Sequence, residues 1–333
     1  MLVSLCVIAY NEEKTIKYLL NDISKQTFPH SNIQLVLVDG CSEDKTKKIM
    51  SNFFKNSDFF EIKVLDNIKK QQAPGWNVAI QNAIGDIIIR VDAHASIPVD
   101  FIEKNVKVLE SGEDISGGKR PNILVNPTNW SELLLMAESS MFGSSIAPYR
   151  KSKEKRYVNS MFHAAYRKDV FNKVGLFNEN LGRTEDNELH YRMRKAGYKF
   201  CYSPEIESYQ HVRSSLRTML KQKFSNGYWI GLTLGVCPGC LSLYHFVPAA
   251  FVFMLIVCSI IYIYSSFFIY SLLALYFTFA IIMSFFAIIQ SEKKSFVMLL
   301  LPCIFFLLHF FYGVGTIFGI LVYPFKRNKL IGN

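Results

Sequence analysis

A chain of 333 residues has room for about two domains, and its composition is uneven along its length. Half of the residues are hydrophobic, and after about residue 240 long runs of Phe, Ile and Leu exclude an ordinary soluble fold. The formal net charge is +10, but the basic residues are scattered and form no nucleic-acid motif, so no nucleic-acid partner is expected. Basic residues beside apolar segments instead predict a cytoplasmic surface next to a membrane.

Four short apolar runs in the first hundred residues alternate with patterns typical of helices. Each run has the character of a strand buried in a parallel sheet, and together they cover residues 2–9, 33–38, 61–65 and 87–91. We expect Asn11 and Ser42 to cap the intervening helices and Pro74 to open a third. The order predicts an α/β fold with a Rossmann-like, mostly parallel sheet.

Polar side chains follow the predicted strands at the points where the strands end. In open parallel sheets ligands bind outside the carboxyl ends of the strands, so these side chains are expected to converge on one edge. They are Tyr10, Asn11, Glu12, Asp39, Asp66, Asp92 and His94. No G-x-G-x-x-G follows the first strand, which disfavours a dinucleotide-binding dehydrogenase.

The middle of the chain is mixed and rich in loops, with one clear predicted helix over residues 185–197. Thr184 is a plausible cap for this helix, acidic residues occupy its first turn, and Gly197 can end it.

Three long apolar segments fill the last third, at residues 246–264, 267–289 and 296–323. The first two are close to the ~20 residues that cross a bilayer and the third is longer, which predicts a multi-pass protein of the cell membrane. Gly313, Gly315 and Gly319 interrupt the last segment. Three crossings would place the basic stretch 326–329 opposite a cytoplasmic N-terminal domain, against the usual charge bias. Either that bias is broken or the last segment is interfacial or re-entrant.

The seven cysteines are irregularly spaced, and no signal peptide precedes them, so a disulfide framework is not expected. Cys237 and Cys240 form an isolated CxxC. A zinc or redox site would need further ligands or a thioredoxin-like context, so a turn leading into the membrane is the favoured interpretation.

Five short motifs, taken in order, resemble the family 2 inverting glycosyltransferases with the GT-A fold. They lie at residues 3–13, 38–46, 75–86, 162–177 and 185–197. The Asp-Ala-His-Ala stretch at 92–95 is most similar to exopolysaccharide glucosyltransferases of the succinoglycan ExoA type. The resemblance implies nucleotide-sugar binding by residues 1–95, acceptor binding by residues 96–235 and a membrane region at 236–333.

The resemblance assigns donor binding mainly to the strand ends. Asp39 would accept the N3–H of uracil, and the other implied donor-binding residues are Ala9, Tyr10, Glu12, Asp66, Asn77 and Asp92. Asp92 and His94 stand where the family has Asp-x-Asp, so they are the implied ligands of a Mn²⁺ or Mg²⁺ cofactor. Because His94 replaces an acid, the identity of the metal is left open.

The implied catalytic residues are Asp186, as the base that deprotonates the acceptor, and its neighbour Glu185. A helix N-terminus lowers the pKa of a carboxyl group, whereas a second carboxylate and desolvation raise it. The sequence leaves the balance between these effects open.

Candidate acceptor residues are more weakly indicated: His163, Arg192, Gln222 and Trp229. The segment 222–229 lacks the Gln-x-x-Arg-Trp motif of processive relatives, which favours addition of a single sugar. The aromatic and basic residues there are equally typical of a membrane-interface belt.

The leading hypothesis is transfer of one hexose from a UDP-sugar to a lipid-linked saccharide. The alternatives are a polyprenyl-phosphate glycosyltransferase and a catalytically silent membrane scaffold.

Overall fold

The computed structural model describes residues 1–53, 57–124, 126–143, 154–212, 215–291 and 293–331. The chain divides into two compact units. Met1–Pro121 and Pro148–His211 form the first, which we call the α/β unit. Asn122–Ala147 and Val212–Asn333 form the second, the helical unit.

The α/β unit is built on a sheet whose first half matches the predicted parallel strands. β3 (Glu61–Asp66), β2 (Ile33–Asp39), β1 (Val3–Ala9) and β4 (Ile87–Asp92) lie side by side in that order, all parallel. Strands β1, β2 and β4 are buried on both faces, as their unbroken apolar runs predict.

The second half of the sheet is mixed rather than parallel. β9 (Ala165–Arg167) runs antiparallel to both β4 and β6 (Ile115–Lys119). β10 (Phe200–Glu207) and the edge strand β8 (Arg156–Val158) complete the order. A separate short pairing joins β5 (Ala95–Ser96) to β11 (Tyr209–His211).

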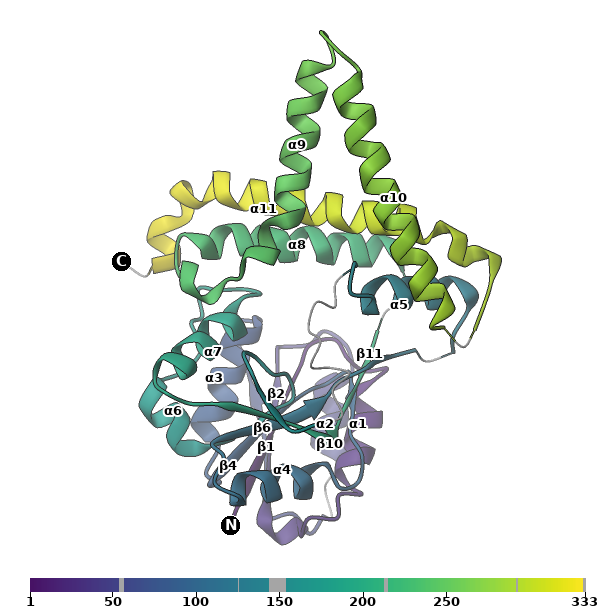
Figure 1. Cartoon of the computed structure of the whole chain (residues 1–333). Helices are drawn as coiled ribbons and strands as arrows, with labels where there is room; N and C mark the ends of the chain where they lie inside the picture. The colour runs from purple at the N-terminus through teal and green to yellow at the C-terminus, as the bar shows by residue number, and fades with distance from the viewer. Residues whose placement is uncertain (54–56, 125, 144–153, 213–214, 292, 332–333) are drawn as a thin grey trace. The chain divides into compact units, whose positions relative to one another are not determined.

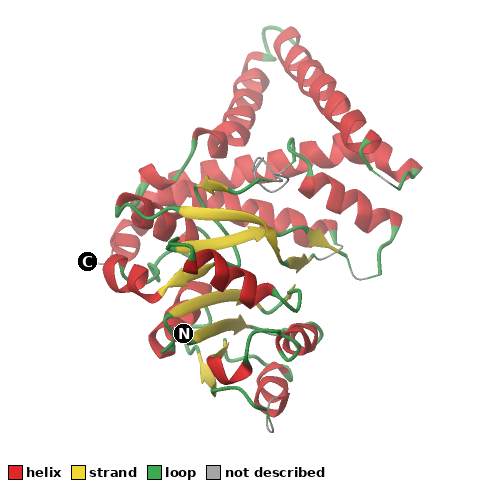
Figure 2. Ribbon diagram, turned by 60° about the horizontal axis from the view of Figure 1, so that its bottom comes forward, coloured by secondary structure: helices red, strands yellow, loops and turns green. Residues whose placement is uncertain are grey.

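Helices cover both faces of the sheet, so the strands form a middle layer (Figure 2). One apolar core includes α1 (Ile16–Ile23), α2 (Thr46–Phe53) and α4 (Phe101–Glu110). The other includes α3 (Gln72–Asn82), α6 (Lys168–Val174) and α7 (Glu185–Lys195). A short 3-10 turn, His30–Asn32, precedes β2. α7 ends at the predicted glycine, since Gly197 has a φ of +95°. The middle of the chain holds more helices than the single one predicted.

The predicted caps at Asn11 and Ser42 are wrong, because these residues bind each other's loops instead. Ser42 Oγ accepts a hydrogen bond from the Asn11 amide (2.9 Å), and Asn11 Oδ1 accepts one from the Glu43 amide (2.9 Å). The helices begin later, with α1 at Ile16 and α2 at Thr46. Likewise α3 begins at Gln72, two residues before the predicted start. The exchange of hydrogen bonds fixes the loops after β1 and β2 against each other.

The helical unit contains the apolar segments (Figure 1). It begins with β7 (Asn122–Ile123) and α5 (Asn129–Ser139), and resumes with α8 (Leu216–Leu234). Two 3-10 turns, Pro238–Cys240 and Leu243–Phe246, lead into α9 (Val247–Ile261). α10 (Phe267–Ile289), the 3-10 turn Phe296–Leu300 and α11 (Leu301–Ile331) follow. Within the described part of the chain, three helices are long and apolar enough to cross a membrane: Leu243–Ile261, Phe267–Ile289 and Phe296–Ile331. All seven cysteines are free, and Cys237 and Cys240 flank a turn.

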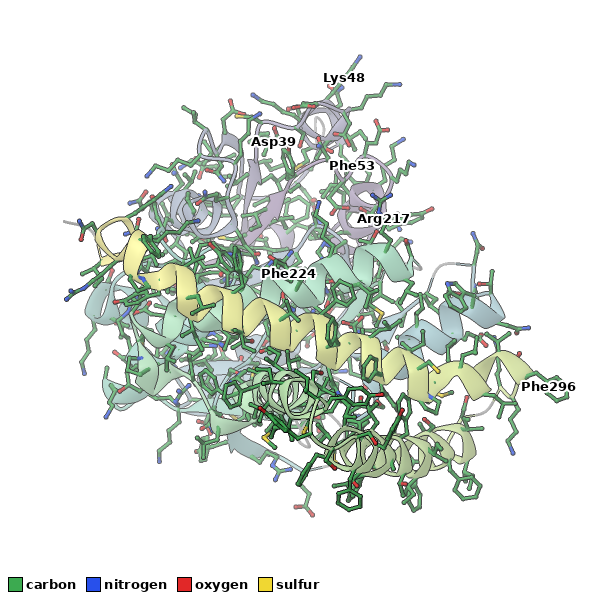
Figure 3. The ribbon with its side chains drawn as sticks, turned by 90° about the horizontal axis from the view of Figure 1, so that it is seen from above. Asp39, Lys48, Phe53, Arg217, Phe224 and Phe296 are labelled. Carbon is green, nitrogen blue, oxygen red and sulfur yellow. The ribbon has the colours of Figure 1, made fainter. Side chains whose placement is uncertain are left out.

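The glycines of the last segment do not interrupt it, because α11 is one continuous helix. Gly315 and Gly319 lie in its contact with α8, where the two helices run side by side (Figure 3), and Gly313 faces Pro248 of α9. A Cβ atom on Gly315 or Gly319 would strike the backbone of α8, and one on Gly227 or Gly231 would strike the backbone of α11. Small residues four positions apart on both helices therefore allow a close backbone approach.

Substituting a large side chain in this contact should separate the two helices. We expect Gly231→Leu to lower the Tm of the detergent-solubilised protein, because its side chain meets the Thr316 carbonyl. Overpacking of this kind costs on the order of 1–3 kcal/mol. Ala250→Leu, at an exposed position of α9, is the matched control and should leave Tm nearly unchanged. Equal thermal unfolding curves for the two variants would contradict the close contact.

Candidate active site

The carboxyl ends of the parallel strands bring the predicted polar residues to one edge of the sheet. The register pairs Ala9 with Asp39 across β1 and β2, and Asp39 with Asp66 across β2 and β3. On the other side of β1, Ile8 pairs with Asp92. The predicted convergence is therefore confirmed for these strand ends.

Asp39 offers a buried acceptor at this edge. Its side chain is 1% exposed, and Oδ2 accepts a hydrogen bond from the Ser42 amide at 2.8 Å. Oδ1 has no hydrogen-bond partner among the described residues. Because an unpaired buried acceptor costs roughly 1–3 kcal/mol, this oxygen is suited to accept an N–H from a ligand. Tyr10 lies beside Gly40 and is half exposed, as a ligand-contacting side chain would be.

Asp66 and Asn77 are both engaged with protein groups. The exposed Asp66 carboxylate forms an ion pair with Lys47 Nζ at 2.7 Å. The Asn77 amide donates to the Phe177 carbonyl (3.0 Å) and to Glu179 Oε1 (3.0 Å), and accepts from the Phe177 amide (2.9 Å). Asn77 therefore holds the segment after α6 in place, and its donor-binding role stays a prediction.

Asp92, at the end of β4, is held by a histidine from a distant loop. His163 Nε2 lies 3.2 Å from Asp92 Oδ2, and His163 Nδ1 lies 3.0 Å from Ser208 Oγ. Burial lowers the pKa of His163, so its neutral ring donates from Nε2 and accepts from Ser208. Burial alone would raise the pKa of Asp92, but the His163 hydrogen bond and, to a smaller extent, the charge of Arg120 lower it strongly. Asp92 is therefore a carboxylate at neutral pH.

His94 supplies a second possible metal ligand beside Asp92. Its Nε2 accepts a hydrogen bond from Gln210 Nε2 at 2.9 Å, and its Nδ1 lies 3.6 Å from Glu12 Oε1. No cluster of three His, Cys, Asp or Glu side chains among the described residues could form a metal cage. A carboxylate and an imidazole nevertheless fit Mn²⁺ when diphosphate oxygens complete its coordination.

Asp186, the predicted base, is paired with a buried arginine that the motifs did not indicate. Arg90 Nη1 donates to Asp186 Oδ1 at 3.0 Å, and both side chains are largely buried. The guanidinium lies between two aromatic rings, 4.3 Å from the centroid of Trp76 and 4.5 Å from that of Phe177. Burial opposes the charge on Arg90, but Asp186 more than offsets it and raises the arginine pKa. Arg90 is thus a permanent counter-ion for Asp186.

Glu185 differs from Asp186 in protonation. Its side chain is 2% exposed, and Oε2 has no hydrogen-bond partner among the described residues. Burial, with a smaller contribution from the charge of Asp186, raises the pKa of Glu185 to about 8. At neutral pH Glu185 is therefore mostly protonated, and of the two neighbouring acids only Asp186 is paired with the Arg90 guanidinium. Burial also lowers the pKa of the nearby His190 to about 4, so its ring is neutral.

The predicted acceptor residues are placed in different surroundings. His163 lies at the site, bound to Asp92. Arg192 binds both oxygens of Glu188 and the carbonyls of Val174 and Leu176, which ties α7 to the end of α6. Gln222 and Trp229 belong to α8 in the helical unit, where Gln222 is exposed and Trp229 contacts Tyr228. Their roles in acceptor binding stay predictions.

Three further residues at the site were missed by the motifs. Arg90 could have been noticed as the one charge inside an apolar strand, Ile-Ile-Ile-Arg-Val. Ser208 and Gln210 carry no comparable signal, because their contacts with His163 and His94 join segments far apart in the sequence.

The known proteins most informative about this chain are sugar transferases. Dolichyl N-acetyl-alpha-D-glucosaminyl phosphate 3-beta-D-2,3-diacetamido-2,3-dideoxy-beta-D-glucuronosyltransferase of Methanococcus voltae is 28% identical over 258 residues. That alignment covers 76% of this chain and 80% of the relative. Succinoglycan biosynthesis protein ExoA of Rhizobium meliloti (strain 1021) is 28% identical over 228 residues, covering 67% of this chain and 68% of the relative.

A solved structure supports the fold. Mannosyltransferase PcManGT from Pyrobaculum calidifontis, in complex with GDP-Man and Mn²⁺, superposes with a TM-score of 0.52 at 19% identity. The match covers 68% of this chain but only 62% of that one, and at this identity it bears on the fold alone.

The family model for glycosyl transferase family 2 matches residues 4–175, which is more than half of the chain and includes the ends of all four parallel strands. The chain therefore belongs to glycosyl transferase family 2 and is a glycosyltransferase with the GT-A fold.

Proposed function

We propose that this enzyme transfers a single sugar, with inversion, from a UDP-hexose to a lipid-linked saccharide in the synthesis of a surface or extracellular polysaccharide. The observation that carries the proposal is the arrangement around β4. Arg90 and Asp92 lie two residues apart on that strand, and Arg90 holds Asp186 by an ion pair. The carboxylate proposed to bind the metal and the proposed base are thus both connected to the end of β4.

Asp39 is the proposed recognition group for the nucleotide base. A buried carboxylate oxygen needs a hydrogen-bond donor, and Asp39 Oδ1 has none among the described residues. The N3–H of uracil would supply that donor. The loops after β1 and β2 frame this position and are fixed by the Asn11–Ser42 hydrogen bond. Because those loops are held before the donor arrives, binding should cost little ordering entropy.

Asp92 and His94 are the proposed holders of a divalent cation. When bound, the cation would offset the charge that grows on the departing diphosphate. Asp92 is ready for this role as a carboxylate, and His163 and Ser208 fix its orientation. His94 would exchange its Gln210 hydrogen bond for the cation.

Asp186 is the proposed general base. It would take the proton from the acceptor hydroxyl as that oxygen attacks the anomeric carbon opposite the diphosphate. Arg90 orients the carboxylate through Nη1 and Oδ1, which leaves Oδ2 for the acceptor proton. Glu185 is mostly protonated at neutral pH and so is a poor base there, which gives the two neighbouring acids separate proposed roles.

A lipid-linked saccharide is the acceptor that the relatives favour. The name of the Methanococcus voltae enzyme specifies an N-acetylglucosaminyl group carried on dolichyl phosphate, and its alignment covers 76% of this chain. The apolar helices would keep the enzyme at the cytoplasmic face of the cell membrane, where such a lipid lies. Transfer directly to a polyprenyl phosphate is the outcome that would replace this proposal.

Replacing the proposed base should abolish transfer but not donor binding. We expect Asp186→Asn to lower kcat by about 10²–10⁴-fold, the usual contribution of a general base, with nearly unchanged donor affinity. Membranes supplied with labelled UDP-sugars and either lipid-linked saccharide or polyprenyl phosphate would measure this and identify the acceptor. Asp100→Asn, at a surface ion pair, is the matched control. Full activity of Asp186→Asn would reject the base, and an inactive wild-type enzyme would favour the scaffold.

The Arg90–Asp186 pair makes a prediction that needs no substrate. We expect Arg90→Met to destabilise the protein by about 3 kcal/mol, because it leaves a buried carboxylate without its partner. Adding Asp186→Asn should recover part of this loss, as measured by denaturant unfolding. Lys104→Met provides the control, since its exposed pair with Asp100 should contribute about 1 kcal/mol or less. Strictly additive losses in the double variant would show that the two groups are not coupled.

The proposed cation ligands make a prediction about metal dependence. EDTA should abolish transfer, and His94→Gln should raise the Mn²⁺ concentration for half-maximal activity by about tenfold or more. His30→Gln, which alters a histidine paired with the exposed Asp58, is the control. An unchanged Mn²⁺ requirement in His94→Gln would show that His94 is not a ligand.

A further inference from the structure

The helices α8 and α11 are parallel neighbours over most of the length of α8. Phe224 contacts Gly315, Tyr228 contacts Gly319 and the Gly235 carbonyl accepts a hydrogen bond from Tyr323, so later residues of α8 meet later residues of α11. Figure 3 shows the two helices side by side, with Phe224 labelled on α8. Two helices in such close contact must lie at the same depth relative to a bilayer.

Helices α9 and α10 form an antiparallel hairpin that stands across α11. At its tip the ring centroids of Tyr262 and Tyr270 are 6.5 Å apart. Nearer its base the ring of Phe251 stacks on that of Tyr276, with the centroids 4.5 Å apart. In Figure 1 the hairpin rises from the α8–α11 pair, and in Figure 3 its helices are viewed nearly end-on while α11 is seen along its length. The base of α9 meets the middle of α11, where Gly313 contacts Pro248.

The direction of these helices excludes a crossing by α11. If α8 crossed the membrane, α9 and α10 would cross twice more, and α11 would then cross in the direction opposite to α8. The two helices are parallel, so this path is impossible. If α11 crossed without α8, the closely packed α8 would still be drawn into the hydrocarbon. α8 begins with the exposed basic residues Arg217 and Lys221, whose charges are costly there.

Helix α5 packs against the first half of α11 and therefore restricts how deep this part of α11 can lie in a membrane. Leu134 and Ala137 of α5 share a buried cluster with Leu301, Phe305 and Leu308 of α11. The segment that contains α5 leaves the α/β unit after Pro121, and the chain is again part of that unit at β8 (Arg156–Val158), so α5 lies on the same side of the membrane as that unit.

Polar contacts between α5 and its neighbours reinforce this placement. Lys223 of α8 pairs with Glu138 at 3.1 Å, and Lys293, just before α11, pairs with Glu132 at 2.6 Å. Ion pairs of this kind belong in an aqueous or interfacial setting rather than in hydrocarbon. Of the three apolar helices, α11 is also the most covered by the rest of the protein: 33% of its apolar stretch is buried, against 17% for α9 and 11% for α10.

We propose that only the α9–α10 hairpin crosses the bilayer, and that α8 and α11 lie together in the membrane surface on the side of the α/β unit. The occupant of the exposed apolar face is thus the lipid bilayer. This inference concerns the path of the chain and does not rest on the proposed reaction.

Length and charge agree with a two-span path. At about 1.5 Å per residue, the 19 residues of Leu243–Ile261 and the 23 of Phe267–Ile289 match a hydrocarbon core about 30 Å thick. No Asp, Glu, Lys or Arg occurs from residue 236 to residue 291. With two crossings the basic residues after the hairpin return to the side of the α/β unit, and the charge bias is satisfied: Lys293, Lys294, Lys326, Arg327 and Lys329.

Aromatic residues mark the two membrane surfaces. Tyr262, Tyr264 and Tyr270 are exposed at the hairpin tip, where an interfacial belt is expected on the far side. On the near side the exposed Phe318, Leu321 and Phe325 of α11 would enter the headgroup region beside the basic residues that follow Pro324.

Protease protection of the full chain tests this path. Three forms carry one epitope tag each: at the N-terminus, at the C-terminus, or between Tyr264 and Ser265. We expect the N- and C-terminal tags to be digested in the same preparation of sealed vesicles, inside-out or right-side-out, and the tip tag only in the opposite one. Detergent should expose all three tags.

Two results would overturn the proposal. Digestion of the N- and C-terminal tags in opposite preparations would show that α11 crosses the membrane. Digestion of the tip tag together with the N-terminal tag would show that the hairpin does not cross. Sugar transfer measured on each tagged form provides the folding control, and inactivity of a correctly oriented chain would bear on the reaction and not on the path.

Discussion

The charge of Arg90 in the middle of β4 is the constraint on which the arrangement of the candidate site depends. A buried guanidinium costs several kcal/mol unless charge and hydrogen bonds compensate it. Trp76 of α3 and Phe177 after α6 cover its two faces, and Asp186 at the start of α7 neutralises it. Three segments of one helical layer therefore converge on a single strand position. The place of the proposed base is set by the core of the sheet and not by a flexible loop.

The strand ends could be predicted because their signal is local and their geometry is generic. Apolar runs identify the strands, and a parallel sheet brings their carboxyl ends to one edge whatever the loops do. Asp39 and Asp92 follow from that rule. His163 does not, because it reaches Asp92 across 71 residues of sequence, from a loop beside the antiparallel strand β9. Nothing in its local sequence indicates that β9 is inserted next to β4.

Two properties could not be predicted correctly from sequence: the helix caps and the pKa of Glu185 in the carboxyl pair. Both depend on long-range contacts and burial. Asn11 and Ser42 have side chains typical of helix caps, but each forms hydrogen bonds with the loop that contains the other. The properties of the carboxyl pair also depend on surroundings that the local sequence does not reveal. Helix position and neighbouring charge affect Glu185 and Asp186 alike, so sequence alone gives them similar properties. Burial, with no hydrogen-bond partner for Oε2 among the described residues, raises the pKa of Glu185, whereas Asp186 pairs with the guanidinium of Arg90.

Hydropathy has a comparable limit in the helical unit, because it measures the apolar character of a segment but not what covers it. α10 and α11 are similarly apolar, yet about three times as large a share of the apolar part of α11 is buried within the protein. The difference comes from glycines that admit the backbone of α8 and from the cluster shared with α5. An apolar helix whose surface is largely buried against protein gains less free energy from contact with lipid. Its position is therefore determined by the helices that it packs against.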